Sequence, residues 1–342
     1  KLLKLNYMNK IENANIIGLL KNDVIISKIK GKNEFIVRYN ENQEIIWEKK
    51  YINTGNKFIC GTKIIIYEGE YTTILDVNTG SFLNKENRYY IKNNCNYIVY
   101  FELDNSKELF INRNKIENFS RLKVFGSNKV FFSDINEPFI KSVNFIDNVD
   151  LFLFNAETYF HQPAQIMEGR VLVSNNKVIF FAHTEDWSNF ATFVLDAQTG
   201  QVLFTTQEMG MKLVEHNSLV YQIQRKAIKI LDPKNLKIET IDVSTYCDEQ
   251  SIFLDDHTVF FYKDKLYTLA REQGSDVYNI WVIFNLKTQL FEHREDMFIN
   301  PKKKKDEKNK MFINDIQAND NLVAIRCSDN LYIFEKQDVE SK

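Results

Sequence analysis

The sequence lacks the features that mark disulfide-rich, zinc-knuckle and membrane-spanning proteins. It holds four cysteines in 342 residues and no CxxC pair, so neither a disulfide scaffold nor a zinc knuckle is indicated and a reducing compartment is expected. No run of about 18 apolar residues occurs, so no membrane span is expected. We therefore expect a cytoplasmic protein. Because the chain begins at Lys1 rather than Met, a periplasmic or secreted location stays open for a chain whose signal segment has been removed.

Neither sign of charge is in excess. The 44 Lys and Arg residues are balanced by 46 Asp and Glu residues, which leaves a formal net charge of −2. A protein that binds nucleic acid through a generally basic surface is therefore disfavoured. We expect no nucleic acid among the partners.

The motifs of common enzymes are also missing. The sequence has no GxSxG, Walker or GxGxxG motif and no EF-hand loop. Its five histidines form no HxH or HxxxH pair. His183 with Glu185 and Asp186 is a candidate acid–base or metal cluster, but residues so close in sequence do not show that their side chains converge. We expect no cofactor and no metal, and we favour a role without catalysis.

Strand-forming residues are abundant. The chain contains 27 Phe and 16 Tyr but 11 Gly and 4 Pro, and Ile and Val occur throughout. β-branched and aromatic side chains fit the half-buried surface of a sheet. The apolar runs are short and are bounded by Asn, Asp, Gly or Lys, and no long stretch has the 3.6-residue period of a helix. These features predict an all-β fold.

Short polar turns recur along the chain at a regular spacing. In eight units a turn separates two apolar strands, near Asn22, Gly61, Asn94, Ser127, Asn175, His216, Asp256 and Asp320. Seven units have a second turn, near Glu41, Asn78, Arg113, Asp147, Gln198, Lys234 and Lys287. The second turn follows the first by about 17 to 23 residues in six units and by about 31 in the seventh.

Each unit therefore reads as four antiparallel strands, A to D, and such a repeat of about 40 residues predicts a β-propeller blade. We predict a single eight-bladed β-propeller domain over residues 1–342. Residues 1–8 form the closing strand of the last blade, 9–311 form seven blades, and 312–342 form the rest of the last blade and a tail. Pairing of the two chain ends removes the exposed sheet edges. Seven blades is the alternative, if the third and fourth units form one blade.

Two turns carry a specific motif. Leu75-Asp76-Val77-Asn78-Thr79-Gly80 and Leu195-Asp196-Ala197-Gln198-Thr199-Gly200 resemble the LDAxTG turn of PQQ-like (quinoprotein-type) β-propeller repeats, and Leu231 to Asn235 is a weaker copy. In that family a Trp docks between blades, and only Trp47 resembles it here. The family includes quinone-dependent dehydrogenases and non-catalytic scaffolds. The resemblance implies the fold, and we favour the non-catalytic branch.

The longest insertions all fall in B–C and D–A connections, at one end of the strands. They span residues 156–169, 183–190, 270–279 and 296–312. Loops on a rigid scaffold often carry recognition, although propeller loops also drift without a function. We predict a partner-binding surface formed by Tyr159, Phe160, His161, Glu185, Asp186, Trp187, Tyr278, Lys302, Lys303, Lys304 and Lys305.

The aromatic residues and the lysines of this predicted surface each have an alternative interpretation. Aromatic residues beside charges, such as Trp187 and Tyr159-Phe160, are typical of interface hot spots. Trp187 and Phe160 could instead cover their own loops as a satellite core. The lysines of residues 302–305 could attract phosphate, an acidic protein or a membrane surface, and a solvated loop is the simpler interpretation.

We therefore predict a non-catalytic propeller that binds another protein, as a scaffold or as a bacterial immunity-type inhibitor. The residue usage, rich in Lys, Asn and Ile, fits a bacterium or a protist. The alternative is an enzyme, or a propeller that binds a small ligand or carbohydrate in its central channel.

Overall fold

The computed structural model describes residues 4–40, 42, 44–51, 57–67, 71–86, 88–93, 97–103, 109–111, 114–116, 122–125, 129–132, 138–144, 149–167, 171–299 and 309–337. Strands dominate these residues, and two short helices accompany them.

The first half of the chain forms four sheets after the N-terminal strand β1 (Lys4–Glu12). Their strands are β2 (Ala14–Leu19), β3 (Val24–Lys30), β4 (Asn33–Tyr39) and β5 (Ile45–Tyr51); β6 (Lys57–Cys60), β7 (Lys63–Tyr67), β8 (Thr72–Asp76) and β9 (Phe82–Glu86); β10 (Arg88–Asn93), β11 (Tyr97–Leu103), β12 (Leu109–Ile111) and β13 (Asn114–Ile116); and β14 (Leu122–Phe125), β15 (Lys129–Phe132), β16 (Phe139–Asn144) and β17 (Val149–Asn155).

The second half of the chain forms the remaining sheets and both helices. Its elements are α1 (Ala156–Phe160), β18 (Ala164–Ile166), β19 (Leu172–Ser174), β20 (Lys177–Thr184), β21 (Phe190–Asp196) and β22 (Val202–Thr206); β23 (Val214–His216), β24 (Leu219–Gln224), β25 (Ala227–Asp232) and β26 (Lys237–Asp242); α2 (Ser244–Glu249), β27 (Ile252–Tyr262), β28 (Lys265–Glu272), β29 (Ile280–Asn285) and β30 (Leu290–Asp296); and β31 (Ile313–Ala318), β32 (Leu322–Cys327) and β33 (Asn330–Gln337).

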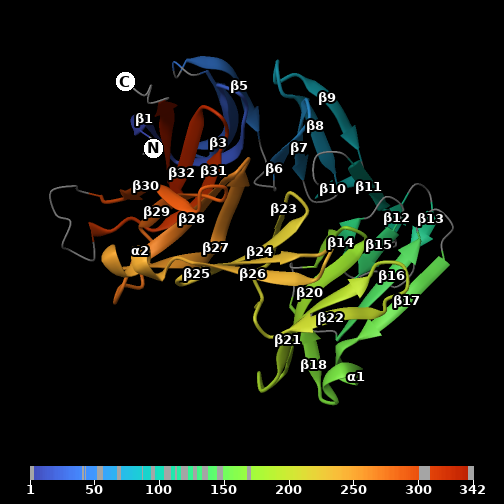
Figure 1. Ribbon diagram of the computed structural model, residues 1–342. Helices are drawn as coiled ribbons and strands as arrows, with labels where there is room; N and C mark the ends of the chain where they lie inside the picture. Colours follow the sequence, from blue (N-terminus) through green and yellow to red (C-terminus); the bar gives the residue numbers. More distant parts are fainter. Residues whose placement is uncertain are drawn as a thin grey trace.

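The fold is a β-propeller. The described strands form eight antiparallel sheets, and Figure 1 shows the sheets following one another around the molecule. Most strands pair with their neighbours in sequence, while β18 pairs with β20 and β1 pairs with β33. The first strands of neighbouring sheets meet, since β2 contacts β6, β19 contacts β23, and β27 contacts β31. The third and fourth units, which the seven-bladed alternative merges, form separate four-stranded sheets. The number of blades stays a prediction, because most side chains of these two sheets lie outside the described residues.

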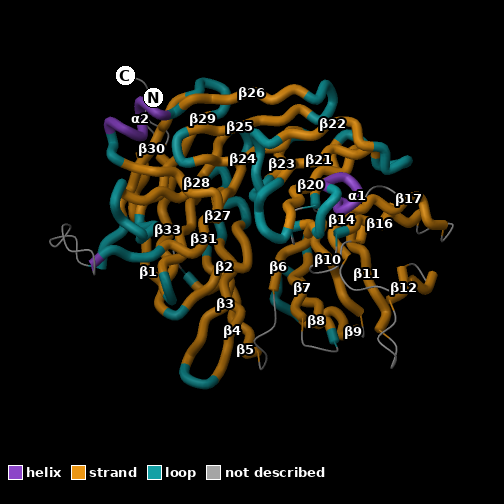
Figure 2. Tube along the Cα trace, turned by 90° about the horizontal axis from the view of Figure 1, so that it is seen from below, coloured by secondary structure: helices purple, strands orange, loops and turns teal. Residues whose placement is uncertain are grey.

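The two ends of the chain pair with each other, as predicted. β1 runs antiparallel to β33, with Leu5 opposite Lys336 and Ile11 opposite Leu331, and it completes the sheet ordered β1-β33-β32-β31. Both Figure 1 and Figure 2 place β1 beside the strands of this sheet. The closing strand extends to Glu12, four residues beyond the predicted end at residue 8, and satisfies the edge that β33 would otherwise expose.

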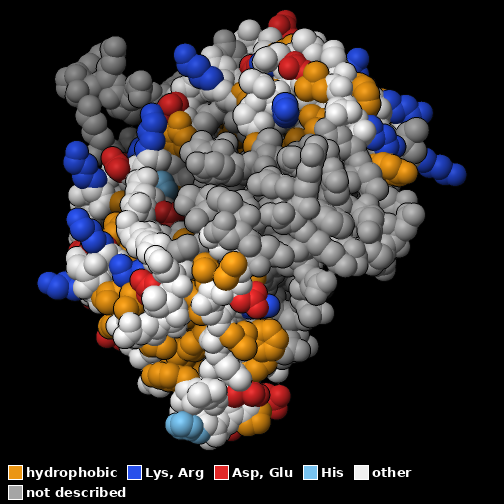
Figure 3. Space-filling view, turned by 90° about the vertical axis from the view of Figure 1, so that its right-hand side faces the viewer, with side chains coloured by type: hydrophobic (Ala, Val, Ile, Leu, Met, Phe, Trp, Pro, Cys, Tyr) orange, Lys and Arg blue, Asp and Glu red, His pale blue; other side chains and the backbone are white. Residues whose placement is uncertain are grey.

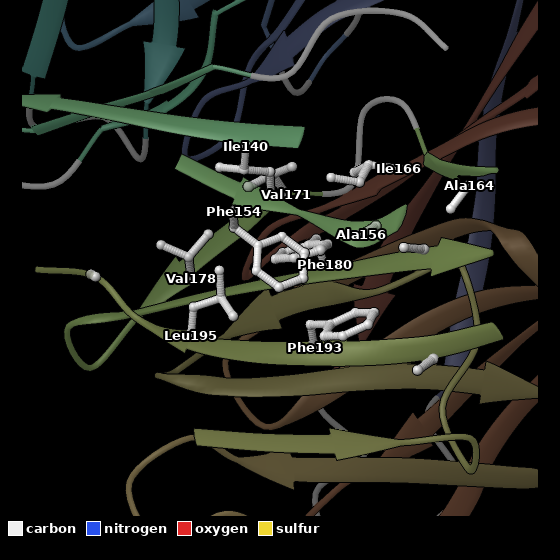
Figure 4. Close-up of a cluster of buried hydrophobic side chains, with 13 residues drawn as sticks. Ile140, Phe154, Ala156, Ala164, Ile166, Val171, Val178, Phe180, Phe193 and Leu195 are labelled. Carbon is white, nitrogen blue, oxygen red and sulfur yellow. The ribbon is translucent and has the colours of Figure 1, made fainter. Parts of the chain in front are cut away.

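Apolar clusters fill the space between neighbouring sheets. Successive residues of a strand point to opposite faces, so Ile25 packs toward β6–β9 while Ile26 packs toward β31–β33. Because both faces of the inner strands are covered, these strands read as continuous apolar runs. Figure 4 shows the cluster between β16–β17 and β20–β21, where the rings of Phe180 and Phe193 stack with centroids 5.3 Å apart. Each buried Phe contributes about 1.5–3 kcal/mol of hydrophobic stabilisation.

The described cysteines behave as small apolar core residues. Cys60, Cys247 and Cys327 are buried, and burial raises the pKa of the Cys327 thiol to about 12. Cys95 lies outside the described residues.

The motif turns have one shared geometry. The carboxylate of Asp76 accepts the backbone N–H groups of Asn78 (2.9 Å) and Thr79 (2.8 Å), and Asp196 repeats both bonds at 2.9 and 2.8 Å. These bonds lower the pKa of Asp76. The closing Gly80 and Gly200 have φ of +65° and +71°, a region that glycine enters without steric cost.

One predicted turn is wrong. Residues near Asp256 do not turn but form an irregularity inside β27, where the register shifts between Leu254 and Val259. The actual turn lies at Lys263 and Asp264, about 23 residues before Lys287, so the seventh unit has the same spacing as the others. His257 is therefore a strand residue rather than a turn residue. A polar segment at a bulge has the composition of a turn, which explains the error.

Candidate functional site

The predicted insertion at residues 183–190 forms a tight loop that joins β20 to β21. We call residues 184–189 the Trp187 loop. Thr184 and Asn189 close it, since the N–H of Thr184 donates to the carbonyl of Asn189 (2.8 Å) and the N–H of Asn189 donates to the hydroxyl of Thr184 (3.0 Å). Asp186 holds its centre by accepting the hydroxyl of Thr184 (2.7 Å) and the N–H of Ser188 (3.0 Å). These bonds lower the pKa of Asp186 to about 2.

The loop presents one aromatic side chain in an unusual conformation. Trp187 has φ of +60°, which is rare for a bulky residue, and its side chain is 48% exposed. Its indole stacks on the buried imidazole of His183, with centroids 3.6 Å apart and an interplanar angle of 13°. Nδ1 of His183 lies 2.7 Å from the carbonyl oxygen of Thr184, which orients the imidazole. The loop therefore holds an exposed aromatic surface in a fixed position.

The predicted insertion at residues 156–169 is not a plain loop. It contains α1, capped by Asn155 through the N–H of Glu157 (2.8 Å), and the strand β18, which pairs with the end of β20. Gln165 lies opposite His183 in this pairing, and the N–H of Glu185 donates to the carbonyl of Pro163 (3.1 Å). The fold thus brings the first two predicted insertions together.

The aromatic residues of α1 have different environments. Phe160 is partly buried against the core shown in Figure 4, as the satellite-core alternative expects. Tyr159 is 44% exposed, and its ring meets the edge of Phe193 at a centroid distance of 4.8 Å. His161 ends the helix with φ of +54° and is exposed. Tyr159 therefore has one face on the core and one toward solvent.

Exposed apolar side chains also lie along α1 and along the outer strands β17 and β22. Figure 3 shows hydrophobic side chains gathered in the lower part of the face where Figure 1 places β17, β22 and α1. The exposed apolar residues of these elements are Val149, Leu153, Tyr159, Val202 and Leu203. Leu153 and Tyr159 lie toward the α1 end, whereas Val149, Val202 and Leu203 begin β17 and β22 beside the C–D turns, at the other end of the strands. Groups of exposed apolar residues of this kind often mark interaction surfaces.

Tyr278 lies in a second group of side chains at the same end of the strands. The guanidinium carbon of Arg271 is 5.7 Å from the ring centroid of Tyr278 and 5.7 Å from that of Phe253. The guanidinium carbon of Arg225 is 5.6 Å from the Phe253 centroid. We call Arg225, Phe253, Arg271 and Tyr278 the cation–aromatic row.

The described residues at the two ends of the insertion, 296–299 and 309–312, pack beside this row. The N–H of Ile313 donates to the carbonyl of Tyr278 (2.9 Å), and the N–H of Met311 donates to that of Met297 (3.1 Å). Lys310 pairs with Glu272 at 2.8 Å. The predicted residues Lys302, Lys303, Lys304 and Lys305 lie outside the described residues.

Sequence reasoning missed His183 as the support of Trp187, and it missed Arg225, Phe253 and Arg271. The stack of Trp187 on His183 needs a local turn that no motif announces. The members of the cation–aromatic row come from two sheets, and a single sequence carries no signal that joins Arg225 to Phe253.

Two classes of feature are absent from the described part of the chain. None of its helices is long and apolar enough to cross a membrane. Its side chains also form no group of three or more His, Cys, Asp or Glu residues that could hold a metal ion.

Comparison with known proteins relates the chain to propellers of known structure. No protein-family model matches the sequence, and no curated protein matches it. The structure is similar to BamB from Moraxella catarrhalis, with a TM-score of 0.52 and 11% identity over 97% of this chain and 100% of that one. It is also similar to Sqt1 from Saccharomyces cerevisiae, with a TM-score of 0.56 and 9% identity over 97% of this chain and 98% of that one. At these low identities the comparison shows a shared fold only. The resemblance to PQQ-like repeats stays a prediction based on the two turns.

Proposed function

We propose that the chain is a non-catalytic β-propeller that binds another protein through its B–C and D–A connections. The observation that carries this proposal is the exposed ring of Trp187. Hydrogen bonds within the Trp187 loop hold this ring stacked on His183. An aromatic ring that is already ordered loses little entropy when a partner covers it. Tyr159 and Leu153, which lie toward the same end of the strands, extend the surface. Trp and Tyr are enriched among the residues that dominate binding energy.

The narrower form of the proposal is an immunity-type inhibitor. In that role the connections around Trp187 and Tyr159 would cover the cleft of a toxin enzyme, and the inhibition would be stoichiometric. A scaffold role predicts instead that a captured partner keeps its activity when the propeller is added in excess. An activity titration of the captured partner separates the two roles.

Replacement of both exposed aromatic residues tests the surface. We expect the variant with Tyr159→Ala and Trp187→Ala to lose its partner in affinity capture from its own cells, with quantitative mass spectrometry as the readout. The melting temperature should change little, because both side chains are more than 40% exposed. Phe82→Ala is the matched control, since Phe82 is an exposed aromatic residue that follows a C–D turn at the opposite end of the strands. Undiminished capture by the double variant would discard this surface.

A further inference from the structure

The cation–aromatic row is an ordered array of charge and aromatic rings. Arg225, Phe253, Arg271 and Tyr278 alternate, with each guanidinium carbon 5.6 to 5.7 Å from the ring centroids beside it. Nζ of Lys226 adds a third cation, 5.5 Å from the Phe253 centroid. Arg, Tyr and Phe are the residue types that interface cores favour. Figure 1 shows β27 and β28, which carry Phe253 and Arg271, close to β24 and β25, which the turn at Arg225 joins, beside α2.

Backbone hydrogen bonds hold the row in place. Arg225 and Lys226 form the tight turn between β24 and β25. The carbonyl of Arg225 accepts the N–H of Leu254 (3.0 Å), next to Phe253, and the carbonyl of Lys226 accepts the N–H of Val243 (3.0 Å). Arg271 donates to the carbonyl of Ser275 from the end of β28. The cations therefore sit on rigid elements rather than on a mobile loop.

One cation of the row has no carboxylate partner among the residues that the structure describes. Lys226 pairs with Asp248 at 2.5 Å, and Arg271 lies 3.6 Å from Asp276. Arg225 is exposed, and within the described ranges no carboxylate lies at salt-bridge distance from it. A guanidinium offers a planar fork of donors that matches a carboxylate. The unpaired charge on a fixed turn is thus suited to an incoming acid.

We propose that the cation–aromatic row binds an acidic segment of a polypeptide, with a carboxylate of that segment on Arg225. This inference rests on the proposed protein-binding function and names the chemistry of the partner. Asp248 and Asp276 lie beside the row and repel phosphates, which are fixed along the backbone of a nucleic acid. Each carboxylate of an acidic peptide stands on a flexible side chain, so one can reach Arg225 while its neighbours turn away from these two acidic residues. These charges favour a peptide over a nucleic acid.

A model peptide tests the proposal without the natural partner. We expect a fluorescein-labelled peptide of eight glutamates to bind the full chain saturably at 50 mM NaCl, measured by fluorescence anisotropy, and to bind less tightly at 300 mM NaCl. Arg225→Ala should weaken binding about five- to tenfold, and Arg225→Lys should restore part of the loss because one charge returns without the fork. Lys234→Ala is the matched control, since it removes one exposed charge from the C–D turn at the other end of the same sheet.

Three results would overturn the proposal. They are absence of peptide binding at 50 mM NaCl, an equal loss in the Arg225→Ala and Lys234→Ala variants, and tighter Arg225-dependent binding of a single-stranded oligothymidine of equal charge. The last result would assign the row to nucleic acid. Because the titration uses neither the natural partner nor Trp187, its failure leaves the capture experiment with Tyr159 and Trp187 unaffected, and the reverse also holds.

Discussion

The indole ring of Trp47 lies over the backbone of Gly80, in the turn of the next sheet. A Cβ atom added to Gly80 would be 2.7 Å from Cε3 of Trp47. Nε1 of Trp47 also donates to the carbonyl of Val77 at 3.2 Å, so the ring joins two sheets through one hydrogen bond and one close contact. The ring of Phe152 lies over Gly200 in the same way, although a Phe ring has no N–H or O–H group to donate.

This contact makes Gly80 sensitive to a methyl group. We expect Gly80→Ala to lower the free energy of unfolding by about 2–4 kcal/mol, because the left-handed φ and the collision with Trp47 both cost energy. Gly61→Ala is the control: Gly61 has φ of +57°, but no atom lies within 4 Å of an added Cβ. It should lose only about 1–2 kcal/mol. Urea unfolding of both variants is the measurement, and equal losses would show that Trp47 does not limit the space.

Closure of the propeller depends on the apolar side of β1. Ile11 is 5% exposed and packs in the cluster between the last sheet and β2–β4. Ile11→Ala should therefore lower the free energy of unfolding by about 2–4 kcal/mol. Lys10, its neighbour on the other face, forms an exposed pair with Glu12 at 3.0 Å, and Lys10→Ala should cost less than about 1 kcal/mol. Similar losses from the two variants would mean that β1 contributes little packing.

Asp186 fixes the position of Trp187. We expect Asp186→Ala to loosen the Trp187 loop and to increase acrylamide quenching of tryptophan fluorescence. The signal reports mainly Trp187, because Trp47 and Trp281 are 9% and 0% exposed. Glu185→Ala is the control, since Glu185 is an exposed residue of the same loop. Unchanged quenching in Asp186→Ala would show that the loop holds its shape without the carboxylate.

The pKa of Asp186 also predicts how the loop responds to acid. Its folded pKa is lowered to about 2 from an ordinary value of 3.8, so the carboxylate stabilises the loop above about pH 4. That contribution is lost as the pH falls through 2. The quenching of wild-type Trp187 should therefore stay constant from pH 8 to pH 4 and rise only below about pH 3. A change centred near pH 6 would point to a different titrating group.

Lys336 makes the free energy of unfolding depend on pH in the alkaline range. Its ammonium donates to the hydroxyl of Tyr267 at 2.6 Å, and burial lowers its pKa from 10.5 to about 8. Between these values the unfolded chain binds more protons than the folded chain, so the free energy of unfolding rises with pH. Lys336→Met should remove that rise. Urea unfolding of both chains from pH 7 to pH 10 tests this, and parallel profiles would contradict it.

Local features of the sequence predicted much of the fold. The turns at Asn22, Gly61 and Asn175 lie where the repeat placed them, because a tight turn is specified by a few consecutive residues. The short helix α2 was not predicted, since six residues are too few to show a helical period. The turn assigned near Asp256 failed for a related reason, because the local composition of a bulge and of a turn is the same.

The candidate site was predictable only in part. Trp187, Tyr159 and Tyr278 were proposed from the sequence because they stand in insertions that interrupt the repeat, and their role in binding stays a prediction. The sequence did not predict that β18 pairs with β20 or that Arg225 and Arg271 lie beside Phe253. These contacts join segments that do not recur at the spacing of the repeat.

The sequence by itself determined the repeating four-stranded unit, the Asp-based turns and the pairing of the chain ends, since alternation of side chains and turn chemistry act over a few residues. Only the tertiary structure decided that His183 supports Trp187 and that Arg225 lies beside Phe253, with no carboxylate of the described residues at salt-bridge distance. Such relations depend on how sheets pack against one another, and packing selects partners by shape and distance rather than by position along the chain.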